Sequence, residues 1–477
     1  MLRSSVDPHG PEPVGPGPAA GPGPEASRGI FGSLFPLAPA KPRTAGRPVA
    51  ARWAEPLLAA VALLAGTLLQ LARIPGTPAW DSLHAEDGSL FLPAALAYPW
   101  HLLTAYGGYL ELAPRLVAQV IALLPVRYAS AAFAAAGALA ASACALFVYH
   151  AGAGHVRNRW LRALLALSVV LLPVAPLEVI DTGVSIPWYL LPALFWASIW
   201  RPVTGRGRAL AGLIGFATAA SLPLAFLLAP LLAARMLAVP RRIREHAVTL
   251  GWVLGCALQA TVIATSHQSR MGELSSSSAP LYYAQDVLLP SLGWHLAWWL
   301  RDAFGITAAA FTIGAVLAVA LGAALATLPA ARPFILAATG TGLLFTAVDT
   351  TIGWVPTQPV TLIQEAGSRY SVLPILLLDA ALLVAADAFL RRAPRPALRK
   401  ALPPVLTAGA LALVLAVGWV TDFRYPVSRS FARPWSQTAT VWLARCHDDP
   451  AGSITVANGT WFGKPVPIAV PCSALRG

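Results

Sequence analysis

Glu86 and Asp87 are adjacent carboxylates in the polar stretch that follows the first apolar segment of the chain. A carboxylate in a cavity at a membrane face can act as a general base on an acceptor hydroxyl, or can hold a divalent cation against a phosphate leaving group. A solvated loop whose acids only mark the outer side of a membrane explains either residue about equally well. We take Asp87 and Glu86 as the candidate catalytic residues, with a divalent cation as an open alternative.

Glu111 and Arg115 stand four residues apart in the sequence GGYLELAPRL. On a helix they lie on one face and can pair with each other, although Pro114 permits that helix only if it has just begun. The guanidinium of Arg115 can instead bind a phosphate or a carboxylate through its planar fork. We favour a structural pair slightly, and we keep both residues as candidates for substrate binding.

Five further candidates for substrate binding stand at the ends of later apolar segments. Asp181 follows one segment in a short turn that directs it toward the same outer side. Trp188 and Tyr189 open the next segment; an interfacial aromatic belt is their default role, and stacking on a sugar is the alternative. Arg369 and Tyr370 begin a late segment at its outer end, whereas basic residues usually gather at the cytoplasmic ends of spans. Arg369 therefore either extends its side chain into the interface or binds an anion. We favour anion binding.

The composition of the 477-residue chain defines the class of protein that carries these residues. Hydrophobic residues make up 57% of the sequence and charged residues only 12%, whereas a soluble globular protein carries about 25% charged residues. The mean hydropathy is +0.63. The net charge of +13 comes from short basic runs between apolar segments, which argues against a nucleic-acid-binding surface. We therefore expect a polytopic membrane protein, without a P-loop, a dinucleotide fingerprint or an HExxH motif.

A helix needs roughly 17 to 25 apolar residues to cross a bilayer. By that criterion the sequence predicts an all-α fold with about eleven transmembrane helices, within a range of about ten to thirteen. The stretch 209–237 is apolar but is broken at Pro223, so we expect two short helices there. The other predicted spans lie near residues 54–72, 127–150, 162–178, 186–200, 247–265, 305–328, 333–348, 371–390 and 402–420.

The charged loops predict which side of the cell membrane each segment faces. Arginine-rich loops alternate with acidic ones, and the positive-inside rule places the arginine-rich loops and the N-terminus in the cytoplasm. Residues 1–50 are rich in Pro and Gly and are expected to be a disordered cytoplasmic tail. We expect residues 51–421 to form the transmembrane domain, with an outer loop at 73–112. Residues 422–477 are then a small extracytoplasmic segment that carries the C-terminus.

Two short apolar stretches in this region are predicted to lie at the membrane interface. Residues 113–125 are too short to span. Residues 88–100 have the pattern of an interfacial amphipathic helix. Its predicted lipid-facing residues are Phe91, Leu92, Leu96, Tyr98 and Trp100.

The tail after Val420 alternates short polar and apolar runs, a pattern typical of β-strands. It contains Cys446 and Cys472, two of the four cysteines of the chain. In an oxidising compartment we expect them to form a disulfide that stabilises the tail by roughly 3 kcal/mol. Two free thiols are the alternative.

Several short motifs resemble the GT-C class of polytopic glycosyltransferases, and poorly characterised bacterial membrane proteins similar to that class. They are ED at 86–87, GYLELAPRL at 108–116, IPWYLLPALFW at 186–196, SLPLAFLLAPL at 221–231 and SRYSVLPILLL at 368–378. The resemblance implies a GT-C-like fold and transfer of a sugar from a polyprenyl-phosphate donor to a cell-envelope acceptor at the outer face. It also implies an essential acidic residue in the first outer loop, which is Asp87 here, with Glu86 as the alternative.

Two other functions fit the same sequence. A transporter or flippase of a lipid-linked intermediate would need ionisable residues or helix breaks inside the spans, and Asp379, Asp387 and the break at Pro223 are the candidates. A non-catalytic envelope assembly protein would instead work through its C-terminal tail. Because the ionisable groups otherwise gather at one face, we favour the lipid-linked sugar transferase.

Overall fold

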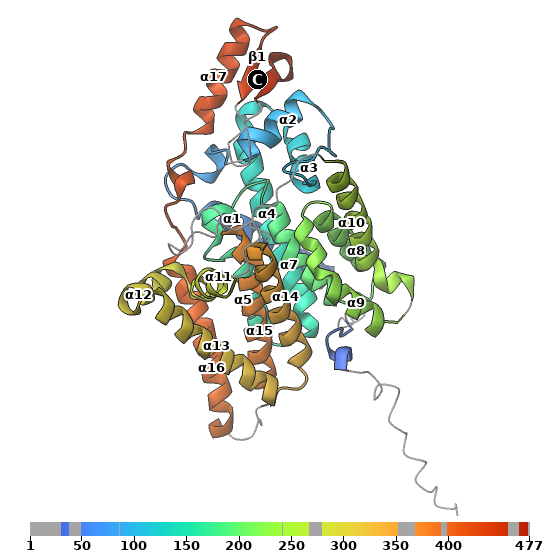
Figure 1. Cartoon of the computed structure of the whole chain (residues 1–477), viewed down its shortest axis with the longest axis vertical. Coiled ribbons are helices and arrows are strands. Elements are labelled where there is room, and N and C mark those ends of the chain that lie inside the picture. Colours follow the sequence, from blue (N-terminus) through green and yellow to red (C-terminus); the bar gives the residue numbers. More distant parts are fainter. Residues whose placement is uncertain are drawn as a thin grey trace, which may run out of the picture.

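The computed structural model describes residues 30–37, 49–84, 86–240, 242–266, 279–351, 368–392, 398–456 and 467–475. These residues are almost entirely helical (Figure 1). The longer helices are α1 (Val49–Leu71), α4 (Ala129–Ala151), α5 (Arg159–Val170), α7 (Ile186–Ile199), α8 (Gly205–Ala219), α10 (Ala247–Thr265), α13 (Ile306–Thr327), α14 (Arg332–Thr351), α15 (Arg369–Arg392) and α16 (Leu398–Thr421). The shorter elements are α2 (Leu92–Ala97), α3 (Leu112–Ile121), α6 (Ala175–Glu178), α9 (Ala229–Ala238), α11 (Ala279–Tyr282), α12 (Trp294–Phe304), α17 (Trp435–Asp448) and the strands β1 (Ser453–Val456) and β2 (Ile468–Pro471).

Seven helical segments of the described chain are long and apolar enough to cross a membrane. They coincide with seven of the predicted spans and comprise Trp53–Leu71, Val126–Gly154, Arg159–Glu178, Ile243–Thr265, Ile306–Thr327, Arg332–Thr351 and Arg369–Arg392. The other four predicted crossings correspond to α7, α8, α9 and α16, which over their described residues fall short of this length or hydropathy. A multi-pass helical membrane protein therefore fits the structure, and the count of eleven stays a prediction.

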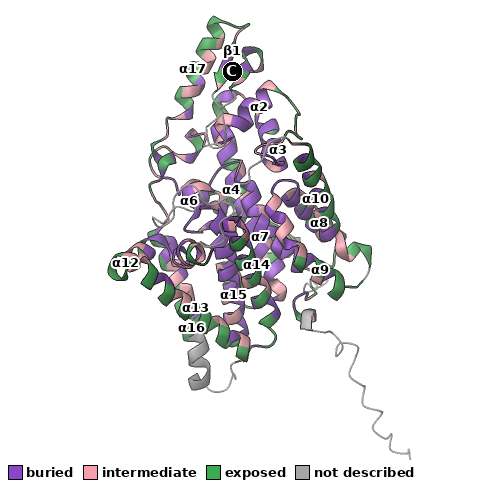
Figure 2. Ribbon diagram, viewed as in Figure 1, coloured by how far each residue is buried: buried purple, intermediate pink, exposed green. Residues whose placement is uncertain are grey.

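Helix α15 forms the centre of the bundle. Its apolar stretch is 83% buried inside the protein, whereas that of α1 is 11% buried and that of α13 is 17% buried. Figure 2 shows the same gradient, with buried residues on α7, α14 and α15 and exposed residues on α12 and α13. A helix that is apolar on all sides and buried by its neighbours is a core element, so α15 provides a fixed support for residues at its ends.

Helices α8 and α10 pack closely through glycines. A Cβ atom on Gly251 would clash with the backbone carbonyl of Gly212, and one on Gly255 would lie 2.6 Å from the carbonyl oxygen of Phe216. Small residues at such an interface allow two helix backbones to approach within membrane-like surroundings. Both helices contact the 3₁₀ turn Pro223–Leu228, which interrupts the apolar stretch 209–237 between α8 and α9.

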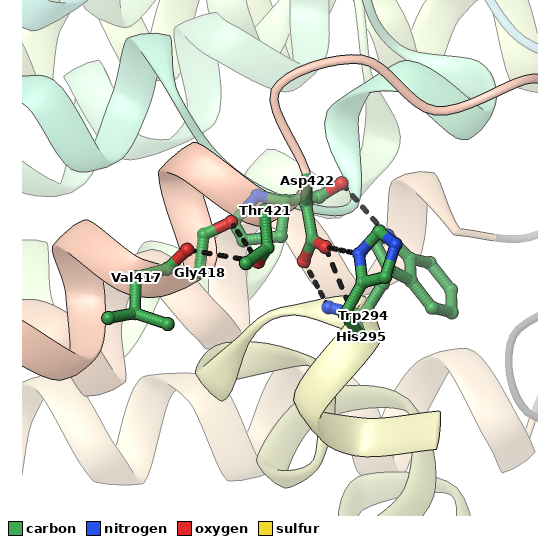
Figure 3. A network of polar contacts seen from close by, with 7 residues as sticks. Trp294, His295, Val417, Gly418, Thr421 and Asp422 are labelled. Carbon is green, nitrogen blue, oxygen red and sulfur yellow. Dashed lines mark hydrogen bonds and ion pairs between the residues drawn. The ribbon is translucent and has the colours of Figure 1, made fainter. Parts of the chain in front are cut away.

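Asp422 joins the end of α16 to the start of α12 (Figure 3). Its fully buried carboxylate accepts the backbone N–H groups of Trp294 and His295 and also contacts Nδ1 of His295. The indole Nε1 of Trp294 donates to the carbonyl of Pro173 at 2.9 Å. A carboxylate at a helix N-terminus satisfies free amide groups there, so this contact fixes the position of α12.

Residues 30–37 depart from the prediction of a disordered N-terminal tail. Ile30–Ser33 form a 3₁₀ turn, and Leu34 and Phe35 are buried. The carbonyl of Phe35 accepts a hydrogen bond from Arg201 at 3.5 Å. Two apolar side chains that can be buried are enough to order this stretch, so the prediction is wrong for 30–37; residues 1–29 and 38–48 lie outside the described residues.

The predicted interfacial helix at 88–100 is a second correction. The structure has a π-helical turn at Asp87–Phe91 followed by α2. Phe91, Leu92 and Leu96 do not face lipid but are buried in a cluster with Trp435 and Val470 of the C-terminal tail. The tail covers the apolar face that the local pattern assigned to lipid, while Tyr98 and Trp100 are exposed. Helix α3, at 10 residues, is too short to span, as predicted.

The C-terminal tail contains a helix in addition to the predicted strands. Strands β1 and β2 pair antiparallel, with Ile454 opposite Val470, and α17 precedes them. Cys446 on α17 and Cys472 after β2 form a disulfide with a Cα–Cα distance of 5.2 Å. Figure 1 shows α17 and β1 at one end of the molecule, beside α2. The tail is thus packed onto residues of the segment 73–112, which is predicted to be the first outer loop.

Candidate functional site

A small cavity lies where the first outer loop meets the starts of α7 and α15. It offers about 10 Å³, the space of roughly one water molecule. Five separate segments of the chain supply its walls. The lining residues are Glu86, Tyr106, Tyr109, Glu111, Val184, Pro187, Trp188, Leu222 and Arg369. Carboxylates, a guanidinium and aromatic rings thus converge at one end of an otherwise apolar bundle.

The adjacent acids Glu86 and Asp87 have different roles. Glu86 lines the cavity, but Asp87 does not. The carboxylate of Asp87 accepts the backbone N–H groups of Gly183 at 2.7 Å and Val184 at 2.9 Å. A Cβ atom on Gly183 would lie 2.6 Å from the ring of Phe133, so only glycine permits this close approach. Asp87 joins the first outer loop to the turn before α7, and Glu86 faces the cavity.

Burial sets the charge of the acids around the cavity. It raises the pKa of Asp87 to about 7, against the opposing effect of its two amide donors and of Arg429. Burial likewise raises the pKa of Asp181 to about 7, opposed by Arg429 and Arg73. The pKa of His84 falls to about 3 because of burial and the positive charges of Arg429 and Arg369. His84 is therefore neutral, and Asp87 and Asp181 can change charge near neutral pH.

Arg369 is fixed at the start of α15 by Glu178. Its Nη1 lies 3.2 Å from Oε1 of Glu178, and its backbone N–H donates to Oε2 at the same distance. The guanidinium also lies over the ring of Tyr370, 5.4 Å from its centroid. The ring of Trp188 packs edge-on against Tyr370 at 5.1 Å. Arg369 and Trp188 therefore line the cavity in fixed positions, and Tyr370 supports both from behind.

Glu111 and Arg115 lie at the start of α3, near enough for the charge of Glu111 to act on Arg115. Glu111 immediately precedes α3 and lines the cavity. Arg115 is buried on α3 with its guanidinium 5.8 Å from the ring centroid of Phe91. Burial lowers the pKa of Arg115, and the charge of Glu111 opposes that shift. Arg115 thus lies behind the cavity wall and acts on the cavity through Glu111.

Asp181 and Tyr189 belong to a second polar cluster behind the cavity. Asp181 has a left-handed backbone, with φ of 55°, and within the described structure both oxygens of its buried carboxylate lack a hydrogen-bond partner. Tyr189 and Arg73 are its buried neighbours. Arg73 is held by the carbonyls of Val170 and Leu172 at 3.0 and 2.9 Å. Neither Asp181 nor Tyr189 lines the cavity.

Tyr106 and Tyr109 are cavity residues that we did not identify from sequence. They form a short antiparallel bridge around Gly107 and Gly108, which have φ angles of 57° and 91°. A Gly-Gly pair between two aromatic residues is the usual sign of a tight hairpin turn. That pattern could have placed the two rings side by side at the site.

No protein family, curated protein or solved structure matches this chain. Its function must therefore be inferred from the site itself. The described residues contain no group of three or more His, Cys, Asp or Glu side chains that could hold a metal ion. Glu86 and Glu111 alone supply fewer carboxylates than such a cation site would need, so we derive no step through a metal.

Proposed function

We propose that this protein is a membrane glycosyltransferase of the GT-C type. It would take a sugar from a polyprenyl-phosphate donor at the outer face of the membrane and transfer it to a cell-envelope acceptor. The supporting observation is the convergence of Glu86, Arg369 and Trp188 on one cavity at the end of an apolar bundle. These are the groups needed to remove a proton, to bind a phosphate and to stack on a sugar.

Each cavity residue has a defined role in this reaction. The acceptor hydroxyl oxygen forms a bond to the anomeric carbon while the bond from that carbon to the carrier phosphate breaks. Glu86 receives the hydroxyl proton. The phosphate leaves with the bonding electron pair, and the guanidinium of Arg369 stabilises its negative charge. Glu178 keeps Arg369 oriented, and Trp188 offers a ring face to the sugar.

The charge distribution supports a cytoplasmic N-terminus. Arg157 and Arg201 lie in loops, Arg159 begins α5, and none of the three lines the cavity. Residues 30–37 pack against Arg201. The C-terminal tail lies at the opposite end (Figure 1), where Tyr106 of the cavity wall packs against the apolar cluster that includes Trp435 and Val470 of the tail. The positive-inside rule then puts the cavity and the C-terminus on the extracytoplasmic side, where polyprenyl-phosphate sugars would enter from the outer leaflet.

Complementation of a deletion strain tests this function. The parent, Glu86→Gln, and the exposed control Asp302→Asn are expressed at matched levels, and lipid-linked sugars and envelope glycans are quantified. We expect Glu86→Gln to slow transfer by about 10²–10⁴-fold, as loss of a general base does, so that the donor accumulates and one sugar is lost from the glycan. The control should behave as the parent. Full complementation by Glu86→Gln would refute the proposed role.

Transport of a lipid-linked intermediate is the second candidate. Asp349 on α14 is fully buried, and its carboxylate has no hydrogen-bond partner in the described structure; Asp379 on α15 is also buried. Ionisable residues within apolar helices are typical of translocation pathways. Transport predicts that the intermediate accumulates on the cytoplasmic side, and transfer predicts that it accumulates on the outer side.

A further inference from the structure

We propose that Arg429, in the tail after α16, is a positioning residue of the cavity. In this role it fixes the first outer loop against the turn before α7 and so holds Glu86 in place. The inference rests on the proposed function where it concerns catalysis, but its structural part is independent of the reaction.

The guanidinium of Arg429 is buried and uses all of its donors. Nε donates to the hydroxyl of Ser82 at 2.9 Å. Nη1 donates to the carbonyls of Ile180 and Asp181 at 2.9 and 3.1 Å. Nη2 donates to the carbonyls of Ala79 and Ser82 at 3.0 and 3.1 Å. A guanidinium has five N–H donors in a fixed planar fork, and here five acceptors from two segments match it.

These two segments are the ones that Asp87 joins. Ser82 lies four residues before Glu86, and Asp181 lies two residues before Gly183. Arg429 therefore connects the segments on one side of Glu86, and the hydrogen bonds from Gly183 and Val184 to Asp87 connect them on the other side. With both connections present, the backbone at Glu86 has little freedom to move relative to the cavity wall.

The tail has further attachments that do not depend on Arg429. The N–H of Thr77 donates to the carbonyl of Ser430 at 2.9 Å. Ser436 binds the carboxylate of Asp81 through its N–H at 2.7 Å and its hydroxyl at 3.0 Å. The indole of Trp435 donates to the carbonyl of Val126 at 2.8 Å. Loss of the Arg429 side chain should therefore leave the tail bound and loosen only the two segments that it connects.

Hydrogen exchange of the full-length protein in nanodiscs tests the structural part. Arg429→Gln should raise exchange about tenfold in peptides covering 79–91 and 180–188, since several hydrogen bonds to these segments are lost. Peptides from α15 and α17 should exchange as in the parent. Arg445→Gln, an exposed change on α17, is the matched control. Ser82→Ala, which removes one acceptor only, should show a smaller rise confined to 79–91.

Transfer kinetics test the positioning role. We expect Arg429→Gln to lower kcat at least tenfold with little change in KM, because the base is misplaced while the donor still binds. Arg429→Lys should restore part of kcat, since an ammonium group reaches some of the five acceptors. Unchanged exchange in both segments, or an equal rise throughout α15 and α17, would overturn the inference. If the local rise occurs but Glu86→Gln remains active, the transferase proposal fails and the positioning of the loop stands.

Discussion

Asp87→Asn should gain stability relative to the parent as the pH rises from 5 to 8. Burial raises the pKa of Asp87 to about 7 in the folded state, above an unfolded value of about 3.9. A raised pKa means that the folded state prefers the neutral carboxyl of Asp87. The contribution of this carboxyl to the free energy of unfolding is therefore fully present below about pH 4 and is lost as the pH rises through about 7. Asparagine does not ionise, but its side-chain NH₂ cannot accept a hydrogen bond, so one of the two amide N–H groups that Asp87 binds loses its partner at every pH. This loss lowers the free energy of unfolding by a constant amount of about 1–3 kcal/mol.

The size of the effect follows from the pKa difference. One pKa unit corresponds to about 1.4 kcal/mol, so between pH 5 and pH 8 the parent should lose about 3 kcal/mol relative to Asp87→Asn. Melting followed by intrinsic tryptophan fluorescence at pH 5, 6, 7 and 8 measures this difference. The variant should melt below the parent at pH 5, and the difference in melting temperature should shift in favour of the variant by a few degrees between pH 5 and pH 8. The exposed Asp302→Asn is the control. A difference in melting temperature that is the same at all four pH values would refute a raised pKa for Asp87.

Three further changes test the packing, the ion pair and the tail. Gly251→Ala should destabilise the protein by about 1–3 kcal/mol through the clash between α10 and α8, whereas Gly322→Ala on α13, which has open space, should be neutral or slightly stabilising on thermal melting. Glu178→Gln should lower the free energy of unfolding by about 2 kcal/mol, a value between those for exposed and buried ion pairs. It should also raise the KM for the donor, because Arg369 loses its fixed position. Cys472→Ser should lower the local stability of the tail by about 3 kcal/mol. Trypsin should then cleave the tail faster than in the parent, while cleavage of the helical bundle stays the same. Equal rates of tail cleavage in the variant and the parent would contradict this prediction.

The spans could be predicted because their signal is local. The predicted span 247–265 coincides with α10, and the predicted span 305–328 coincides with α13 to within one residue at each end. An uninterrupted apolar run bounded by Arg or Pro specifies such a helix without knowledge of its neighbours. The buried face of α2 could not be predicted in this way. Phe91 is covered by Val470, nearly the whole chain away, and an apolar face covered by lipid has the same local pattern as one covered by protein.

The site was predicted at the level of segments but not of individual side chains. Glu86, Glu111, Trp188 and Arg369 line the cavity, whereas Asp87, Arg115, Asp181, Tyr189 and Tyr370 do not. Glu86 and Asp87 are neighbours with the same chemistry, and only the amides of Gly183 and Val184 distinguish them. Arg429 was overlooked because its five acceptors are backbone or hydroxyl groups of distant segments, which leave no charge pattern in the sequence.

The ionisable residues within the spans separate transfer from transport. Asp387 accepts the N–H groups of Arg157 and Asn158 at 3.1 and 2.8 Å and pairs with Arg391 at 2.9 Å, so it has a structural role at the end opposite the cavity. Asp349 lies in the last turn of α14, close to Arg369.

Among the acidic residues that the structure describes in the spans, Asp379 lies nearest the middle of one, close to Ser168 on α5. A single carboxyl with one hydroxyl neighbour does not form a relay across a membrane. The transporter proposal would nevertheless require Asp379 to act as that relay. Asp379→Asn keeps a group that can bond Ser168, so we expect it to retain transfer within about twofold of the parent, measured as turnover of the lipid-linked sugar. Loss of turnover in Asp379→Asn, together with full activity of Glu86→Gln, would transfer the function from the outer cavity to the interior of the bundle.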